Sequence, residues 1–206
     1  MFTGIVQGMG IVQAREDLPG LLRFSIALPE CARGNVRVGA SVSVAGVCLT
    51  VESATLDEAV FAVMQETLDR TMLGSLQING AVNIERATQY GDEIGGHQVS
   101  GHVSGVAAIS AIERPANNHV ITFTCPRDWF KYILPKGYIA LDGASLTIVN
   151  PDSVAGTFQV FLIPETLAMT TFGKKEVGDF VNVEFDVATQ AIVDTTERVL
   201  AIQNKL

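Results

Sequence analysis

Gly46-Val47-Cys48-Leu49-Thr50-Val51 is repeated 97 residues later as Gly143-Ala144-Ser145-Leu146-Thr147-Ile148. The same offset aligns residues 2–8 (FTGIVQG) with residues 99–105 (VSGHVSG), so the likeness extends beyond one stretch. Because the offset is close to half of the 206 residues, it indicates two copies of one unit.

Two further blocks support the duplication after a gain of two residues. At an offset of 99, Glu66-Thr67-Leu68 meets Glu165-Thr166-Leu167, and residues 82–85 (VNIE) meet residues 181–184 (VNVE). Matching blocks in one order, with so small a drift, are not expected by chance. The chain is therefore a duplicated domain, and each unit of roughly 90 residues is large enough to bury a small core.

The composition indicates an ordered globular protein. Apolar residues make up 48% of the chain and charged residues 17%, a balance unlike that of disordered chains. The net charge of −8 argues against a general nucleic-acid binder, which needs a basic face for the phosphates.

Cysteine usage and the start of the chain bear on location. Cys31, Cys48 and Cys125 form no CxxC pair, which fits a reduced cytosolic protein better than a disulfide scaffold or a zinc site. Residues 1–4 do not begin a secretory signal, and no apolar run reaches the ~20 residues that span a bilayer. We expect a cytoplasmic protein with no membrane or nucleic-acid partner.

The periodicity is that of short strands. Leu21–Leu28, Ser41–Val44, Cys48–Glu52 and Val60–Val63 are brief, rich in β-branched or aromatic residues, and bounded by turn formers. Many such strands, punctuated by glycine, predict a mainly β fold in which each unit is a closed antiparallel barrel of about six strands. Closure removes the exposed edges that so small a sheet would otherwise carry.

The remaining organisation follows from local composition. One-turn helices are expected near Leu68–Leu73 and Leu167–Phe172. The polar, glycine-rich stretch Tyr90–Gly96 joins the two units. We therefore expect three parts, which are an N-terminal barrel (1–96), a C-terminal barrel (97–187) and a final helix (188–206).

The final segment has no counterpart in the first half. Residues 188–203 (ATQAIVDTTERVLAIQ) lack glycine and proline, and Ile192, Val193, Thr196, Val199 and Leu200 share one helical face. Such a narrow stripe can pack on its own barrel or on copies of itself from other subunits. We favour oligomerisation, by analogy with coiled-coil seams.

Two of the three histidines, His97 and His102, lie in one glycine-rich stretch. No HExxH or CxxC pattern supplies further metal ligands, so we expect no metal. A buried, hydrogen-bonded histidine is one interpretation, and proton transfer near neutral pH is the other. Because the repeat pairs His102 with Ile5, the two halves differ chemically at this point.

The repeated stretch differs between its copies in the same way. Cys48 corresponds to Ser145, and Ala45 corresponds to Asp142. A carboxylate three residues before a serine could orient the hydroxyl or take its proton, whereas the structural alternative is an Asx-turn at Asp142-Gly143. Cys48 can likewise be a small buried hydrophobe.

Other polar positions also keep two interpretations. Glu66 and Glu165 can be solvated at the barrel rim or can accept hydrogen bonds from a ligand's N–H groups. Thr50 and Thr147 can be ordinary strand residues or hydroxyls lining a pocket. Two similar barrels with different pocket residues would suit two copies of one ligand held in unequal roles.

Several motifs together resemble the riboflavin synthase family. The resemblance covers nearly the whole chain, and it is the combination of motifs that makes it specific. The residues that carry it are Met1–Val6, Gly46–Val51, Gly95-Gly96-His97, Ser100-Gly101-His102, Asp142-Gly143, Ser145-Leu146-Thr147 and Pro164-Glu165-Thr166-Leu167.

The resemblance implies two tandem six-stranded Greek-key barrels that bind lumazines, and a C-terminal helix that forms a homotrimer. It implies a dismutation in which one 6,7-dimethyl-8-ribityllumazine gives four carbons to another, yielding riboflavin and 5-amino-6-ribitylamino-uracil. No cofactor is implied. The active site would form between the N-terminal barrel of one subunit and the C-terminal barrel of the next. Some members sit inside a lumazine synthase shell.

The resemblance also implies the site residues. Those expected near the reacting atoms are His102, Cys48, Ser145, Asp142, Thr147 and Lys136. Those expected to line the ligand in the first half are Phe2, Gly4, Ile5, Val6, Ser41, Cys48, Leu49, Thr50, Ala62, Val63, Met64, Gln65, Glu66, Thr67, Gly101, His102 and Val103. Those expected in the second half are Lys136, Ser145, Leu146, Thr147, Phe161, Leu162, Ile163, Pro164, Glu165 and Thr166.

Two other functions compete with this one. The first is a non-enzymatic lumazine- or flavin-binding fluorescent protein, whose relatives tend to lose the histidine-rich stretch and the second-half pocket that this chain keeps. The second is a flavin-reductase-type barrel, which would need a nucleotide-binding domain, and no GxGxxG fingerprint opens a helix here.

Overall fold

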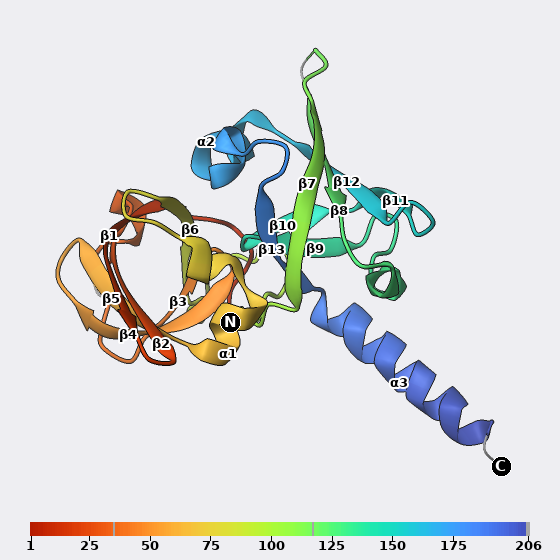
Figure 1. The fold of residues 1–206 in the computed structure, drawn as a ribbon, viewed down its shortest axis with the longest axis horizontal. Coiled ribbons are helices and arrows are strands. Elements are labelled where there is room, and N and C mark those ends of the chain that lie inside the picture. The colour runs from red at the N-terminus through yellow and green to blue at the C-terminus, as the bar shows by residue number, and fades with distance from the viewer. Residues whose placement is uncertain (35, 117, 205–206) are drawn as a thin grey trace.

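The computed structural model describes residues 1–34, 36–116 and 118–204, and it places two β domains side by side with one helix projecting from them (Figure 1). The strands of the first domain are β1 (Gly8–Leu18), β2 (Leu21–Ala27), β3 (Ser41–Val44), β4 (Val47–Ala54), β5 (Glu58–Met64) and β6 (Ala81–Arg86). The strands of the second are β7 (Gly105–Glu113), β8 (His119–Thr124), β9 (Tyr138–Leu141), β10 (Ala144–Thr147), β11 (Val149–Asp152), β12 (Thr157–Leu162) and β13 (Phe180–Phe185).

Short helices fill the gaps between the strands, as expected, although they begin a few residues earlier than predicted. The α-helices are α1 (Gln65–Arg70), α2 (Pro164–Met169) and the projecting α3 (Val187–Gln203). The 3-10 helices are η1 (Glu30–Ala32), η2 (Met72–Ser75), η3 (Arg127–Lys131) and η4 (Thr171–Lys174).

The first domain is a closed barrel with the strand order β1-β2-β5-β4-β3-β6. Since β5 returns beside β2 and β6 returns beside β3, the connections are Greek keys. Strand β2 alternates buried and half-buried residues, and its Phe24 lies opposite Phe61 of β5 in the core, where both are fully buried. Each such side chain stabilises the fold by roughly 1.5–3 kcal/mol. The first predicted barrel is confirmed.

The second domain has the same strand order but seven strands, β10-β9-β13-β7-β8-β12-β11. The counterpart of β4 is divided into β10 and β11, so the sheet is a curled half-barrel and not the six-stranded barrel that was expected. The break between β10 and β11 falls at Ile148. Within β11, Asn150 has a left-handed φ of 46°, and Pro151 has no N–H for the ladder. The register of β11 against β12 is irregular at this point.

The two copies of the repeated stretch meet at the domain junction. Each begins at a two-residue hairpin turn, Ala45-Gly46 and Asp142-Gly143, with positive φ at both positions, as type I′ turns require. A Cβ on Gly46 would lie 2.6 Å from the Gly143 nitrogen. Glycine is therefore needed at this point, and the turns that shape each barrel also set how closely the barrels approach.

Helix α3 begins where its sequence pattern predicts. Asp186 caps it by accepting a hydrogen bond from the Thr189 N–H at 2.8 Å. The helix has no buried residue, and it contacts its own domain through Tyr132, whose hydroxyl bonds the Asp194 carboxylate, and through Lys131, 2.6 Å from Glu197. Among the described residues, no helix combines the length and apolar character needed to cross a membrane.

Candidate functional site

Each domain carries a pocket, and the two pockets occupy equivalent places in the repeat. The first, of about 310 Å³, is lined by Cys48, Glu66, Thr67, Arg70, Thr71, Gly101, His102 and Val103. The second, of about 340 Å³, is lined by Gly4, Ile5, Val6, Ala144, Ser145, Ile163, Glu165, Thr166, Met169 and Thr170. Within the described residues, no group of three or more His, Cys, Asp or Glu side chains is placed to hold a metal ion.

Each pocket is completed by the other half of the chain. The segment 99–103, which opens the second half, crosses to the first barrel, where the Gly101 carbonyl accepts a hydrogen bond from the Cys48 N–H at 2.9 Å. The segment 2–6 crosses to the second domain, where the Gly4 carbonyl accepts one from the Ser145 N–H at 2.8 Å. We call these two stretches the crossing segments, and they pair with each other through a bridge between Phe2 and Val99.

The first pocket contains His102 and Cys48. His102 is exposed, Cys48 is half-buried, and both lie on the pocket wall. Glu66 forms an ion pair with Arg70, four residues along α1. The wall therefore carries an imidazole, a thiol and a paired carboxylate. Because the ion pair is exposed, we expect it to contribute little to stability.

The second pocket keeps a glutamate, Glu165, where the first has Glu66, but it has Ile5 and Ser145 in place of His102 and Cys48. The Ser145 hydroxyl contacts a histidine behind the pocket wall. His97 Nδ1 lies 2.6 Å from the Ser145 hydroxyl oxygen, and its ring stacks on Tyr138 with centroids 5.1 Å apart. Burial lowers the pKa of His97, and the charge of Asp186 opposes this only in part. A neutral imidazole is favoured, so one of its nitrogens can accept the Ser145 proton.

His97 was not among the residues that we expected near the reacting atoms. The sequence offered a signal, since His97 and His102 share one glycine-rich stretch, but no spacing rule connects His97 with a serine 48 residues away. The contact arises because the segment containing His97 runs beside the N-terminal crossing segment, with the His97 N–H donating to the Thr3 carbonyl at 3.1 Å.

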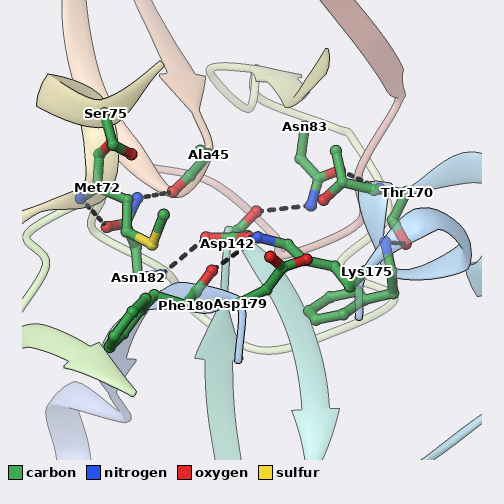
Figure 2. Close-up of polar contacts among 12 residues, drawn as sticks. Ala45, Met72, Ser75, Asn83, Asp142, Thr170, Lys175, Asp179, Phe180 and Asn182 are labelled. Carbon is green, nitrogen blue, oxygen red and sulfur yellow. Dashed lines mark hydrogen bonds and ion pairs between the residues drawn. The ribbon is translucent and has the colours of Figure 1, made fainter. Parts of the chain in front are cut away.

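Asp142 lies at the junction between the domains (Figure 2). Its carboxylate accepts the Asn182 N–H at 2.8 Å and pairs with the Lys175 ammonium at 3.1 Å, while its carbonyl accepts from the Asn83 side chain at 2.9 Å. Burial raises the pKa of Asp142, and Lys175 opposes the shift. His97, and not Asp142, therefore holds the Ser145 hydroxyl.

Strand alternation divides the remaining predicted residues into two groups. Leu49, Val63, Leu146 and Leu162 are buried in the two domain cores. Their neighbours face outward, because successive side chains of a strand point to opposite faces. These outward residues are Thr50, Ala62, Met64, Thr147, Phe161 and Ile163. Of this outward group, Ile163 lines the second pocket.

The other predicted residues take varied positions. Gln65 and Pro164 begin α1 and α2 at the pocket rims. Ser41 lies opposite Thr50 in the sheet, but it lines a separate cavity of about 570 Å³. Lys136 is exposed, with a left-handed φ of 65°. Phe2, which begins one crossing segment, is buried against Val99 of the other and Ala140.

Comparison with known proteins agrees with this geometry. The family model described as "Lumazine binding domain" matches residues 3–87 and again residues 100–186. The riboflavin synthase of Escherichia coli strain K12 is 45% identical over 204 residues, which cover 98% of this chain and 94% of the relative. The riboflavin synthase of Chlamydia pneumoniae is 43% identical over 205 residues, covering 100% of both chains.

The chain belongs to the riboflavin synthase family.

Solved structures with the same fold include LumP complexed with riboflavin, which matches with a TM-score of 0.82 and 27% identity over 90% of this chain and 99% of that one. LumP complexed with 6,7-dimethyl-8-(1'-D-ribityl) lumazine matches with a TM-score of 0.80 and 26% identity over the same shares. The greater identity to the synthases, over more of this chain, favours the enzyme over the fluorescent binding protein.

Proposed function

We propose that this chain catalyses the dismutation of two 6,7-dimethyl-8-ribityllumazine molecules, in which one gives four carbons to the other. The products are riboflavin and 5-amino-6-ribitylamino-uracil. The observation that carries the proposal is the pair of equivalent pockets with unequal walls. One has Cys48 and His102 where the other has Ser145 and Ile5. Two copies of one substrate can thus be held in similar poses and treated differently.

The proposed reaction needs a base that removes a proton from one substrate, and a site that aligns the two substrate rings. The C7 methyl of the lumazine is acidic because its anion delocalises into the heterocycle, so a positioned base and hydrogen-bond donors promote proton loss. Aligning two rings lowers the barrier further, because the bound reactants no longer lose freedom at the moment of reaction. His102 and Cys48 in one pocket, and Ser145 with His97 in the other, are the groups that we propose for these roles.

We further propose that the active form is a homotrimer assembled through α3. Ile192, Val199 and Leu200, on the predicted stripe, are 67%, 48% and 52% exposed. Apolar side chains beside the pockets, such as Met64 (63%) and Ile163 (63%), are also open to solvent. A first pocket of one subunit facing a second pocket of the next would cover both surfaces. A cytoplasmic location and a lumazine synthase shell remain predictions.

Purified protein supplied with 6,7-dimethyl-8-ribityllumazine alone should form riboflavin, measured by its absorbance and by chromatography. One riboflavin should appear for every two lumazines consumed. Tight binding without turnover would instead support the fluorescent binding protein.

His102→Ala is expected to lower turnover by roughly a hundredfold or more, because positioned proton transfer contributes about 10²–10⁴-fold. The fold should persist, since His102 is exposed. Turnover and the circular dichroism spectrum are compared with those of wild type. Unchanged turnover would exclude a role for His102 in the reaction.

Truncation after Phe185 should convert trimers to monomers, because it removes α3 and its exposed apolar stripe. Sedimentation velocity measures the change, and Glu113→Gln in the full chain, at an exposed position outside α3, serves as a surface control. A trimer that persists in the truncated protein would contradict the assignment of α3.

A further inference from the structure

Two buried glutamates hold the crossing segments in place, and they do so in matching ways. Glu184 of β13 accepts three hydrogen bonds, from the Ser100 N–H and hydroxyl, both at 2.7 Å, and from the Gly101 N–H at 2.8 Å. Glu85 of β6 accepts three, from the Thr3 N–H at 2.6 Å, the Thr3 hydroxyl at 2.8 Å and the Gly4 N–H at 3.1 Å. Each glutamate is 4% exposed.

The hydroxyl that bonds to each glutamate also accepts a hydrogen bond from the backbone N–H two residues further along the chain. The Ser100 hydroxyl accepts the His102 N–H at 3.1 Å, and the Thr3 hydroxyl accepts the Ile5 N–H at 3.2 Å. One carboxylate therefore fixes three successive residues of a crossing segment. The third residue is in each case the one that differs between the pockets, His102 in the first and Ile5 in the second.

Each glutamate belongs to one domain but holds a segment that completes the pocket of the other domain. Glu184 belongs to the second domain, yet the segment that it holds completes the first pocket, where Gly101 contacts Cys48. Glu85 belongs to the first domain, and its segment completes the second pocket, where Gly4 contacts Ser145. We propose that Glu184 and Glu85 are positioning residues, each setting the shape and ligand affinity of the pocket on the opposite domain.

The energetics fit this role. Hydrogen bonds to a charged acceptor are about twice as strong as neutral ones, and a buried carboxylate without them would be unstable. Burial raises the pKa of Glu85, and the three bonds from Thr3 and Gly4 oppose that shift. A glutamine fits the same space, but its NH₂ group would face a backbone N–H, so at least one bond is lost and two donors meet.

The inference rests on the proposed function only for the choice of ligand, and riboflavin binding tests it without turnover. In a Cys31→Ser background, Cys48 is the reporter thiol, because burial raises the pKa of Cys125 to about 12 and suppresses its reactivity. Protection of Cys48 from a maleimide by riboflavin then measures affinity at the first pocket. Adding Cys48→Ser and Ser145→Cys moves the reporter to the second pocket.

Glu184→Gln should weaken riboflavin protection of Cys48 by about tenfold, which corresponds to about 1.4 kcal/mol, and should leave the second-pocket reporter within about twofold. Glu85→Gln should show the reverse pattern. Glu113→Gln, at an exposed position, is the matched control and should change neither. Equal losses at both pockets, or a loss at the pocket of the glutamate's own domain, would overturn the proposal.

Ser100→Ala gives a second route should Glu184→Gln not fold. It removes the hydroxyl that links Glu184 to His102 and leaves the buried carboxylate with two of its three bonds. We expect a smaller loss, about threefold, at the first pocket alone. Full protection of Cys48 in folded Ser100→Ala would contradict the relay from Glu184 to His102. Failure of the wild-type protein to make riboflavin would reject the proposed reaction, and the two reporters would still decide the positioning roles.

Discussion

Gly101→Ala is expected to reduce riboflavin formation to about 1% of the wild-type rate or less, a loss of about 2.7 kcal/mol in transition-state stabilisation. Gly101 has a φ of +84°, and a Cβ added to it would lie 2.5 Å from the Cβ of Cys48. A left-handed non-glycine residue costs about 1–3 kcal/mol, and overpacking costs about 1–3 kcal/mol more. The crossing segment must move, and it carries His102 with it. Initial rates with 6,7-dimethyl-8-ribityllumazine measure the loss.

Gly91→Ala separates the two contributions. Gly91 also has a left-handed φ, of +98°, but nothing lies within 4 Å of an added Cβ. This variant should keep most of its activity, because it has the backbone strain without the clash. Similar rates for the two alanine variants would show that the close approach to Cys48 does not shape the first pocket. Thermal unfolding of both variants separates a local displacement from a general loss of stability.

The architecture was largely predictable because duplication leaves a strong signal. The offsets of 97 and 99 residues identified two similar β units, and the glycine spacing indicated short strands. The irregular register of β11 against β12 coincides with Asn150 taking a left-handed φ beside Pro151. The first half has Ser53 and Ala54 there and accommodates the irregularity as a bulge within β4. Such local choices depend on neighbouring strands and are not visible in periodicity.

The candidate site was predictable in its members but not in its connections. The repeat correctly paired Gly4 with Gly101 and Cys48 with Ser145, because aligned positions occupy equivalent places. It contained no information on which barrel each crossing segment would join. The contacts with the opposite barrel are made by the Gly101 and Gly4 carbonyls, which accept from the N–H groups of Cys48 and Ser145. The segments themselves are held by the carboxylates of Glu184 and Glu85, more than eighty residues away in the sequence.

The spacing between Asp142 and Ser145 was misleading for a specific reason. A tight turn at Asp142-Gly143 leads into β10, so Ser145 already lies in the strand while Asp142 stays at the tip of the hairpin. The carboxylate is directed toward the domain junction, where Lys175 and Asn182 satisfy it. Proximity in sequence therefore did not become proximity in space.

The buried pair of Asp142 and Lys175 leads to the second large prediction. Asp142→Ala should lower the melting temperature by roughly 6–12 °C, because breaking a buried ion pair costs about 3 kcal/mol or more. The side chains of Lys175 and Asp142 are only 15% and 5% exposed, so the lysine left behind stays largely out of water. Its bond to the Phe180 carbonyl, at 2.7 Å, remains but does not neutralise its charge. Differential scanning calorimetry measures the shift.

The repeat supplies the matched rescue variant. The first half has Ala45 and Leu76 at the positions equivalent to Asp142 and Lys175. Asp142→Ala combined with Lys175→Leu copies that pair, removes both charges together and should regain most of the lost stability, because replacing a buried ion pair by apolar groups is often close to neutral. We expect the double variant to keep about half or more of the wild-type rate, since a purely structural role contributes little to the barrier. A stable double variant that makes no riboflavin would instead show that the Asp142 carboxylate acts in the reaction, as the family resemblance implied.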